Sequence, residues 1–212
     1  MSIILCTQHK GGAGKTTLAV HLAGILATSI NRILLIDCDT QRNSWWFYFN
    51  SKANTPLDMK EYSDRLSILW NPERQPIKRI AAPETYDHII LDMSTPLEYT
   101  VKVIVDNHPD IVLIPVSTHP YAIDGLDDTL PVISKLEELA GTPKVVIVPL
   151  GASKSKINKR ISDISSVPSN YRLHNRMKNV QKKMDLALEE KKPIWAYSGY
   201  ENLRDYFQSL LV

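Results

Sequence analysis

Two lysines, Lys10 and Lys15, bracket a glycine-rich turn in the stretch QHKGGAGKTTL at residues 8–18. An apolar run precedes the turn and a helix-forming run follows it, which is the setting of a phosphate-binding loop. Backbone N–H groups in such a loop point at phosphate oxygens, and the N-terminus of the following helix adds a favourable dipole. The sequence therefore predicts a nucleotide site formed by Gly11, Gly12, Ala13, Gly14, Lys15, Thr16 and Thr17.

Lys15 and Thr16 carry the chemistry that this loop predicts. A lysine at this position meets the β and γ phosphates, and the hydroxyl that follows it ligates Mg²⁺. The alternative is a glycine turn before an ordinary helix, but Gly-Lys-Thr after an apolar strand is a specific signal. Lys10 has no such task, and residue chemistry alone favours a surface lysine as much as a functional one.

Three aspartates stand at or just beyond the ends of apolar runs. Asp37 ends RILLID, Asp39 follows two residues later, and Asp92 ends HIILD. α/β proteins bind ligands at the carboxyl edge of their strands, where these carboxylates would gather. Asp92 is placed to hold the hydration shell of Mg²⁺, as a Walker B aspartate does. Any one of the three could instead cap a helix, but together with the phosphate-binding loop they favour a nucleotide and metal site.

The nucleotide is predicted to be ATP. GTP-binding proteins with this loop usually carry an Asn-Lys-x-Asp motif that reads the base, whereas Asn158-Lys159 continues as Arg160-Ile161. The expected cofactors are therefore ATP and Mg²⁺.

Motifs spread along most of the chain resemble the ParA/MinD family of deviant Walker-type ATPases, and most closely its short ParA proteins. KGGAGKTT matches K-G-G-x-G-K-T-T, and RILLIDCDTQRNS resembles V-L-L-I-D-x-D-P-Q-x-N. YDHIILDMSTPL resembles Y-D-x-I-I-I-D-x-P-P, and VLIPVSTHPYAIDGL resembles V-L-I-P-V-x-x-x-x-x-A-x-x-G-L. The ending ALEEKKPIWAYSGYENLRDYFQSLL is similar to the family's closing strand and helix.

The resemblance implies a role for Lys10, as the signature lysine that reaches across a nucleotide-sandwich dimer to the partner's phosphates. A cation from the opposite chain would offset repulsion between two bound triphosphates and act on charge that develops during phosphoryl transfer. The resemblance also implies that Asp39 orients the attacking water and that Asp37 and Asp92 support Mg²⁺ through waters. The expected catalytic residues are Lys10, Lys15 and Asp39, and the expected metal-site residues are Thr16, Asp37 and Asp92.

Two positions depart from the family pattern. Thr40 stands where the family usually has proline, and Ser94-Thr95-Pro96 replaces its usual Pro-Pro region. Neither change removes a group that the chemistry requires. Both can alter loops that move with nucleotide state, so the hydrolysis rate is not predicted.

Short apolar runs alternate with helix-like segments, which is typical of a mostly parallel α/β sheet with helices on both faces. Runs such as RILLID and IVLIPV lack a period of two, which predicts strands buried on both sides. We expect strands at residues 2–7, 32–37, 67–70, 87–92, 110–116 and 144–149. We expect helices at 15–29, 41–51, 73–82, 98–106, 122–140, 155–164, 177–191 and 200–211. The length of 212 residues predicts a single P-loop NTPase domain over residues 1–212.

The apolar runs are far shorter than the roughly 20 residues that a membrane-spanning helix needs. The N-terminal run reaches His9 and Lys10 too soon for a signal peptide, so we expect a cytoplasmic protein. Cys6 and Cys38 fall in or beside predicted strands without metal-ligand spacing. This favours buried thiols over a disulfide or a metal site.

The formal net charge of +2 conceals an uneven distribution. Residues 151–192, the basic segment, hold eleven lysines and arginines against four acids, so this segment carries +7 and the rest of the chain −5. The resemblance to ParA proteins implies nonspecific DNA as the partner, and a basic segment is the expected footprint of phosphate-backbone contacts. A solvated helix surface is the alternative for any one residue. The candidate DNA-binding residues are Lys154, Lys156, Lys159, Arg160, Arg176, Lys178, Lys182 and Lys183.

The resemblance and the basic segment together predict a switch ATPase that partitions or positions cargo. ATP would favour a homodimer, the dimer would bind the nucleoid, and a ParB-like adaptor would stimulate slow hydrolysis. The cargo could be plasmid or chromosome DNA or a protein organelle such as a carboxysome. No helix-turn-helix precedes Ser2, so operator-specific DNA binding is not expected.

Two other functions fit parts of the sequence. A MinD-like membrane-associated ATPase needs a C-terminal amphipathic helix with a basic polar face, but the final turns hold Arg204 beside acidic or neutral residues. A metabolic P-loop ATPase of the dethiobiotin-synthetase or metal-cluster-loading type would need neither Lys10 nor the basic segment. The aromatic run SWWFYF most simply packs on the core or at a dimer interface, and a partner-docking surface is the alternative.

Overall fold

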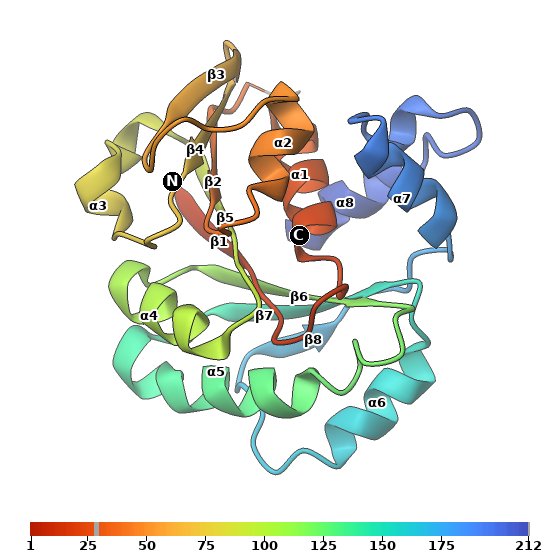
Figure 1. The fold of residues 1–212 in the computed structure, drawn as a ribbon. Helices are drawn as coiled ribbons and strands as arrows, with labels where there is room; N and C mark the ends of the chain where they lie inside the picture. The colour runs from red at the N-terminus through yellow and green to blue at the C-terminus, as the bar shows by residue number, and fades with distance from the viewer. Residues whose placement is uncertain (28–29, 212) are drawn as a thin grey trace.

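The computed structural model describes residues 1–27 and 30–211. Within them the strands form one sheet in the order β3-β4-β2-β5-β1-β6-β7-β8 (Figure 1). β3 and β4 pair antiparallel, and every other neighbouring pair is parallel. The strands are β1 (Ser2–Cys6), β2 (Ile33–Asp37), β3 (Met59–Ser63), β4 (Leu66–Trp70), β5 (His88–Asp92), β6 (Ile111–Ser117), β7 (Lys144–Leu150) and β8 (Tyr171–Leu173). The predicted α/β fold is confirmed.

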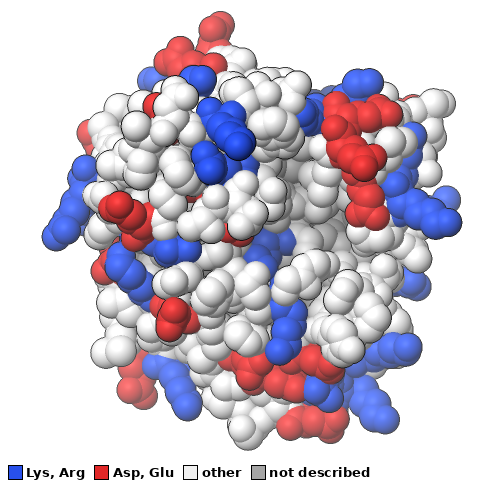
Figure 2. Space-filling view, in the orientation of Figure 1, with Lys and Arg blue, Asp and Glu red and all other residues white. Residues whose placement is uncertain are grey.

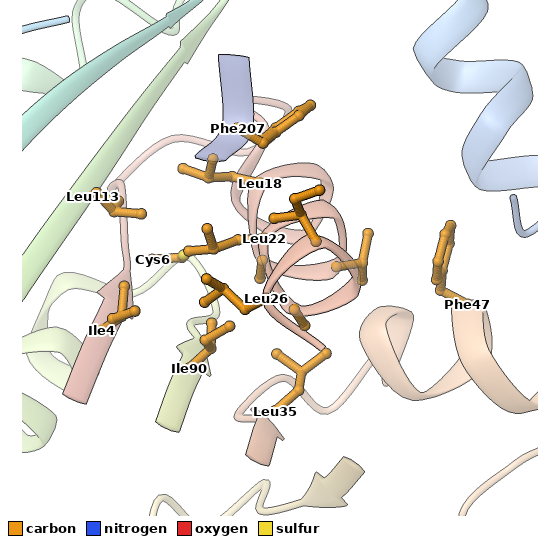
Figure 3. Close-up of a cluster of buried hydrophobic side chains, with 14 of the residues drawn as sticks. Ile4, Cys6, Leu18, Leu22, Leu26, Leu35, Phe47, Ile90, Leu113 and Phe207 are labelled. Carbon is orange, nitrogen blue, oxygen red and sulfur yellow. The ribbon is translucent and has the colours of Figure 1, made fainter. Parts of the chain in front are cut away.

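Helices cover both faces of this sheet (Figure 1). The α-helices are α1 (Lys15–Leu26), α2 (Asn43–Phe49), α3 (Ile77–Ile80), α4 (Leu97–Asn107), α5 (Leu126–Ala140), α6 (Lys154–Ser162), α7 (Gln181–Glu189) and α8 (Leu203–Gln208). The 3₁₀ helices are η1 (Pro83–Thr85), η2 (Ile194–Ala196) and η3 (Ser209–Leu211). Alternate strand residues serve opposite faces: in β5, Ile90 packs under α1, whereas Ile89 and Leu91 pack with α4 and α5. Figure 3 shows the α1 side, where Leu18 and Leu22 lie over the sheet.

The six predicted strands are present, each within one residue of its expected bounds. β3 and β8 were not predicted, and both lie at the edges of the sheet. All five residues of β3 are exposed, so its sequence MKEYS needs no apolar face. β8 has only three residues. Edge strands of this kind lack the continuous apolar run that marks the buried strands.

The helix predictions were wrong mainly at the boundaries. Of residues 73–82 only 77–80 are helical, because the Asn71 side chain hydrogen-bonds to the backbone of Gln75 and holds a tight loop there. α7 begins at Gln181 instead of residue 177, because the Met177 N–H donates to the Pro149 carbonyl at the end of β7. α5 begins four residues later than expected. The expected end of the first helix at Ser29 lies outside the described residues, and the expected closing strand is the 3₁₀ helix η2.

The predicted positions of the cysteines and the aromatic run are confirmed. Cys6 and Cys38 are free and buried. Trp45 and Phe47 of SWWFYF are buried in the core beside α1, whereas Trp46 is 43% exposed. No helix among the described residues is long and apolar enough to span a membrane.

The C-terminal helix is part of the core. Phe207 of α8 is fully buried, and its ring stacks on the His21 ring of α1 with 5.0 Å between centroids. Leu203 and Leu210 pack into the same cluster. The apolar face of this helix is therefore used inside the domain.

Replacing Phe207 tests this packing. Phe207→Ala leaves a large cavity between α8 and α1, and we expect the free energy of unfolding to fall by about 3–5 kcal/mol. Urea unfolding followed by tryptophan fluorescence measures the change. Leu139→Ala is the matched control, because Leu139 is 72% exposed on α5 and its truncation should change stability by less than about 0.5 kcal/mol. Equal effects of the two substitutions would contradict the packing.

Candidate functional site

The loop between β1 and α1 encloses a cleft of about 300 Å³, and residues 11–17 line it. Gly14 has a φ of 105°, a left-handed conformation that favours glycine, and it directly precedes α1. A Cβ atom at Gly14 would lie 2.6 Å from Leu150 Cδ1, so no other residue fits without a shift. The backbone of the loop thus comes close to the sheet and leaves its N–H groups for an anion.

Lys15 lies at the floor of this cleft and is 8% exposed. Its ammonium donates a hydrogen bond of 3.3 Å to the Lys10 carbonyl across the loop. Burial lowers the pKa of Lys15, and the carboxylates of Asp92 and Asp39 oppose this shift. A cation held in this way is available to phosphate oxygens of a bound nucleotide.

Asp37 and Asp92 stand side by side, because they occupy paired positions at the ends of β2 and β5. Both are almost completely buried. Asp37 accepts hydrogen bonds from the N–H groups of Asp39 (3.0 Å) and Trp45 (2.9 Å). Burial, with the neighbouring Asp92 as a second cause, raises the pKa of Asp37 to about 8. Burial also raises the pKa of Asp92 to about 6, against hydrogen bonds from Ser44 and Thr16.

The residues around Asp92 fit a magnesium ion. Asp92 Oδ2 accepts a bond of 2.7 Å from the Ser44 hydroxyl, whereas its buried Oδ1 has no hydrogen-bond partner. Thr16 lines the same cleft. The described residues contain no cluster of three or more His, Cys, Asp or Glu that could bind a metal by themselves. Mg²⁺ needs no such cluster, because it keeps several waters and takes substrate phosphates as ligands.

Asp39 also lines the cleft, beside Asn43 and Thr95. Its backbone is fixed at both ends, by the N–H bond to Asp37 and by its carbonyl, which accepts a 2.9 Å bond from Trp70 Nε1. The predicted group of Lys15, Thr16, Asp37, Asp39 and Asp92 is therefore brought together at the carboxyl edge of the sheet.

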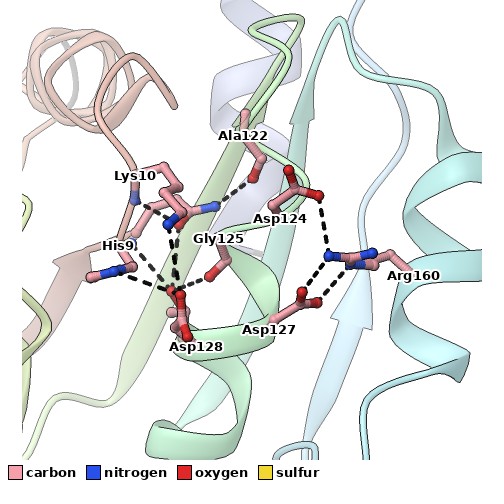
Figure 4. Close-up of polar contacts among 10 residues, drawn as sticks. His9, Lys10, Ala122, Asp124, Gly125, Asp127, Asp128 and Arg160 are labelled. Atoms are coloured by element: carbon pink, nitrogen blue, oxygen red, sulfur yellow. Dashed lines mark hydrogen bonds and ion pairs between the residues drawn. The ribbon is translucent and has the colours of Figure 1, made fainter.

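The Lys10 side chain does not line this cleft. Its ammonium lies 3.9 Å from Asp128 in the first turn of α5, and the side chain is 38% exposed (Figure 4). His9 Nε2 also faces Asp128, at 3.6 Å. Within the described chain, Lys10 therefore contributes only its backbone to the nucleotide site.

The wall of the cleft opposite the phosphate-binding loop is formed by α7 and by the segment that precedes α7 in the chain. Its residues are Met177, Gln181, Met184, Asp185 and Leu188. Gln181 Nε2 donates a 2.8 Å bond to Asp185 Oδ1. The thioethers of Met177 and Met184, beside the polar pair Gln181 and Asp185, suit a flat heterocycle with hydrogen-bonding edges, such as a nucleotide base. These residues lie more than 160 positions from the loop and share no motif with it, so the sequence carried no signal for them.

The predicted DNA-binding residues fall on α6, on α7 and on the segment before α7. In Figure 2, Lys and Arg gather at the right-hand edge, at the level of α7 above and α6 below. Arg160 is engaged, because its guanidinium forms ion pairs with Asp127 and Asp124 (Figure 4). Arg176 donates two bonds to the Gly151 carbonyl, and Lys183 lies over the Tyr197 ring. The exposed lysines are Lys156, Lys159, Lys178 and Lys182.

Comparison with known proteins agrees with this geometry. A model of the CobQ/CobB/MinD/ParA nucleotide binding domain matches residues 4–196. The chain belongs to this family. Together with its phosphate-binding loop, membership of the ParA/MinD group makes the chain an ATPase.

The chain is similar to proteins with functional names. The chain is 26% identical to the sporulation initiation inhibitor protein Soj of Bacillus subtilis over 177 residues, which are 68% of this chain and 69% of Soj. It is also 26% identical to the maintenance of carboxysome distribution protein A of Gloeobacter kilaueensis over 128 residues, 60% of this chain. That alignment spans only 55% of the relative.

Solved structures of the ParA/MinD type share the fold. The ATP complex of a Cyanothece McdA variant has a TM-score of 0.78 at 18% identity, covering 99% of this chain and 95% of that one. The cell division ATPase MinD of Pyrococcus furiosus has a TM-score of 0.72 at 14% identity, covering 99% and 96%.

Replacing Asp92 separates metal binding from folding. Its pKa is raised in the folded state, so its contribution to stability is largest below pH 4 and is lost as the pH rises through about 6. Asp92→Asn keeps an acceptor for Ser44 but removes a buried charge, so at pH 8 we expect the nucleotide-free protein to gain on the order of 1–3 kcal/mol. The variant should lose the extra thermal stabilisation that Mg²⁺ adds to ATP. Calorimetry with ATP, with and without Mg²⁺, measures both effects, and an unchanged Mg²⁺ response would contradict the assignment.

Proposed function

We propose that this ATPase is a dimerising switch that partitions or positions cargo through nucleotide-dependent binding to nonspecific DNA. The observation that carries the proposal is the position of Lys10. Its ammonium lies outside the cleft that its own loop builds, at an exposed acidic residue. A second subunit that faced this surface could receive that ammonium at its own phosphates.

The residues of the cleft suit phosphoryl transfer to water. The N–H groups of the loop and the Lys15 ammonium hold the phosphates, and their positions are set by burial against the sheet. Asp39 lines the cleft and its backbone is fixed, which supports a role in orienting the attacking water. Bound Mg²⁺ would neutralise charge on the phosphates, and Thr16, Asp37 and Asp92 are the residues that would hold its hydration shell.

A lysine from a second subunit would complete this arrangement. Two nucleotide-bound subunits that meet face to face bring two triphosphates close together, and an incoming cation reduces that repulsion. The ion pair with Asp128 is half-exposed, so breaking it costs little. Lys10 can therefore exchange Asp128 for the phosphates of the partner, which would couple nucleotide state to dimerisation.

Nonspecific DNA is the proposed matrix. The exposed lysines of α6, of α7 and of the segment before α7 lie on one side of the molecule and present charges without a base-reading element. Arg160 and Arg176 are held by intramolecular partners, so we assign the DNA contacts to Lys156, Lys159, Lys178 and Lys182 in the first place. The name of the Gloeobacter kilaueensis relative favours a protein organelle as the cargo. We propose plasmid or chromosome DNA as the alternative cargo, a ParB-like adaptor as the stimulating partner and the nucleoid as the location.

Membrane attachment is less well supported than DNA binding. A MinD-like C-terminal helix would need a free apolar face, whereas α8 and η3 bury Phe207 and Leu210 against α1. A metabolic ATPase would leave both the outward position of Lys10 and the basic surface without a role.

The role of Lys10 is tested by truncation. Lys10→Ala should bind ATP within about twofold of wild type, because the side chain does not line its own cleft, yet lose ATP-dependent dimerisation and at least about a hundredfold in hydrolysis rate. Sedimentation velocity and phosphate release measure the two effects. Asp128→Asn, which removes only the intramolecular partner, is the control and should still dimerise. A dimeric, active Lys10→Ala enzyme would overturn the proposal.

DNA binding is tested by charge reversal on the exposed face. With ATP and Mg²⁺, wild-type protein should bind duplexes of unrelated sequence, with affinity that falls steeply as salt rises. Lys178→Glu combined with Lys182→Glu should weaken binding about tenfold or more and flatten the salt dependence by about one unit per lost contact. Lys135→Glu, an exposed change on α5, should have little effect. Binding that is indifferent to nucleotide, or equal in all three proteins, would contradict the assignment.

A further inference from the structure

Arg74 is a buried cation without an acidic partner. It is 8% exposed, and its backbone has a left-handed φ of 55°. Among the described residues no carboxylate lies within ion-pair distance of its guanidinium, and its buried Nε has no hydrogen-bond partner. A buried arginine is normally paired with an acid. The burial of the unpaired Arg74 guanidinium therefore needs another explanation.

The surroundings of Arg74 hold it rigidly beside the nucleotide site. Its guanidinium lies 3.6 Å from the centre of the Tyr99 ring on α4, and its Nη1 donates a 2.6 Å bond to the Pro72 carbonyl. Lys102 donates to the Arg74 carbonyl at 2.6 Å. The loop itself is fixed to the end of β2, because the N–H of Asn71 donates to the Asp37 carbonyl at 2.8 Å.

The remaining donor of Arg74 reaches the loop that follows Asp92. Its Nη2 donates a 3.0 Å bond to Ser94 Oγ, and Ser94 is 6% exposed. The next residue, Thr95, lines the nucleotide cleft, as Asp39 does. A chain of contacts therefore runs from the end of β4 through the guanidinium to the wall of the cleft.

The contact replaces a covalent restraint. In the sequence pattern that this chain resembles, prolines stand at the positions of Ser94 and Thr95, and proline fixes φ without any hydrogen bond. Serine does not fix its own φ, so a contact of its side chain is the restraint available at this position. The Arg74 guanidinium supplies that hold from another part of the chain.

We propose that Arg74 is a positioning residue for ATP hydrolysis, because it fixes the Ser94-Thr95 loop against the cleft in place of the proline pair. Arg74 itself does not line the cleft. Its effect falls on the rate of the chemical step and does not involve the DNA-binding residues.

Arg74→Met tests the proposal, because methionine fills a similar volume and loses every donor. We expect kcat for ATP hydrolysis to fall about tenfold, since a small misplacement near the reacting groups is costly, with the Kd for a fluorescent ATP analogue within about twofold. Adding Ser94→Pro should restore most of kcat, because proline restores the restraint. The Ser94 N–H donates no backbone hydrogen bond in the described structure, so proline removes none.

Arg172→Met is the matched control. Arg172 is also partly buried with an unpartnered Nε, and it donates to the Leu210 carbonyl away from the cleft. Its loss should lower thermal stability and leave kcat unchanged. If Arg74→Met does not fold, Ser94→Ala tests the proposal with the same measurements of kcat and Kd. This substitution removes only the hydroxyl that accepts the hydrogen bond from Arg74. A kcat within twofold of wild type in Arg74→Met or Ser94→Ala, or no recovery with Ser94→Pro, would overturn the proposal.

Discussion

The burial of two neighbouring carboxylates, Asp37 and Asp92, is the constraint on which the rest of the site depends. Parallel pairing of β2 with β5 places them side by side, away from water. Each would oppose ionisation of the other, and burial opposes ionisation of both. Specific neighbouring groups stabilise the two carboxylates. Asp37 accepts hydrogen bonds from two backbone N–H groups, Asp92 accepts one from the Ser44 hydroxyl, and the Lys15 ammonium attracts Asp92 electrostatically.

The same constraint explains the shape of the neighbouring elements. The first turn of α2 faces the two acids, because Ser44 and the Trp45 N–H must reach them, and this fixes the aromatic run that follows in the core. The loop after β4 is held to the Asp37 carbonyl through Asn71, which places Arg74 beside the loop after Asp92. The groups that satisfy the acids thus also position the walls of the cleft.

A second charged cluster lies beside the phosphate-binding loop, at His9 and Lys10 (Figure 4). Asp124, Asp127 and Asp128, in and just before the first turn of α5, pair with Arg160 and with Lys10. Gln8 fixes the loop to this turn, since its Nε2 donates to the Ala122 carbonyl at 2.8 Å. A Cβ at Gly125 would lie 2.2 Å from Gln8 Oε1, so a larger residue there would displace the Gln8 side chain. Lys10, which we propose for the dimer interface, and Arg160, one of the predicted DNA-binding residues, therefore both form ion pairs with acids in or just before the first turn of α5.

The sequence by itself determined the buried strands, the phosphate-binding loop and the acids at the strand ends, because continuous apolar runs and a glycine-rich turn are local signals. Only the tertiary structure decided what depends on distant contacts. These include the exposed edge strand β3, the start of α7 at Gln181, the wall of the cleft opposite the phosphate-binding loop, and the separation of Arg160 from the exposed lysines. The charge count of the basic segment was visible in the sequence. Which of its charges face solvent depends on acids of α5 that lie more than thirty residues away, since ion pairing follows distance in space.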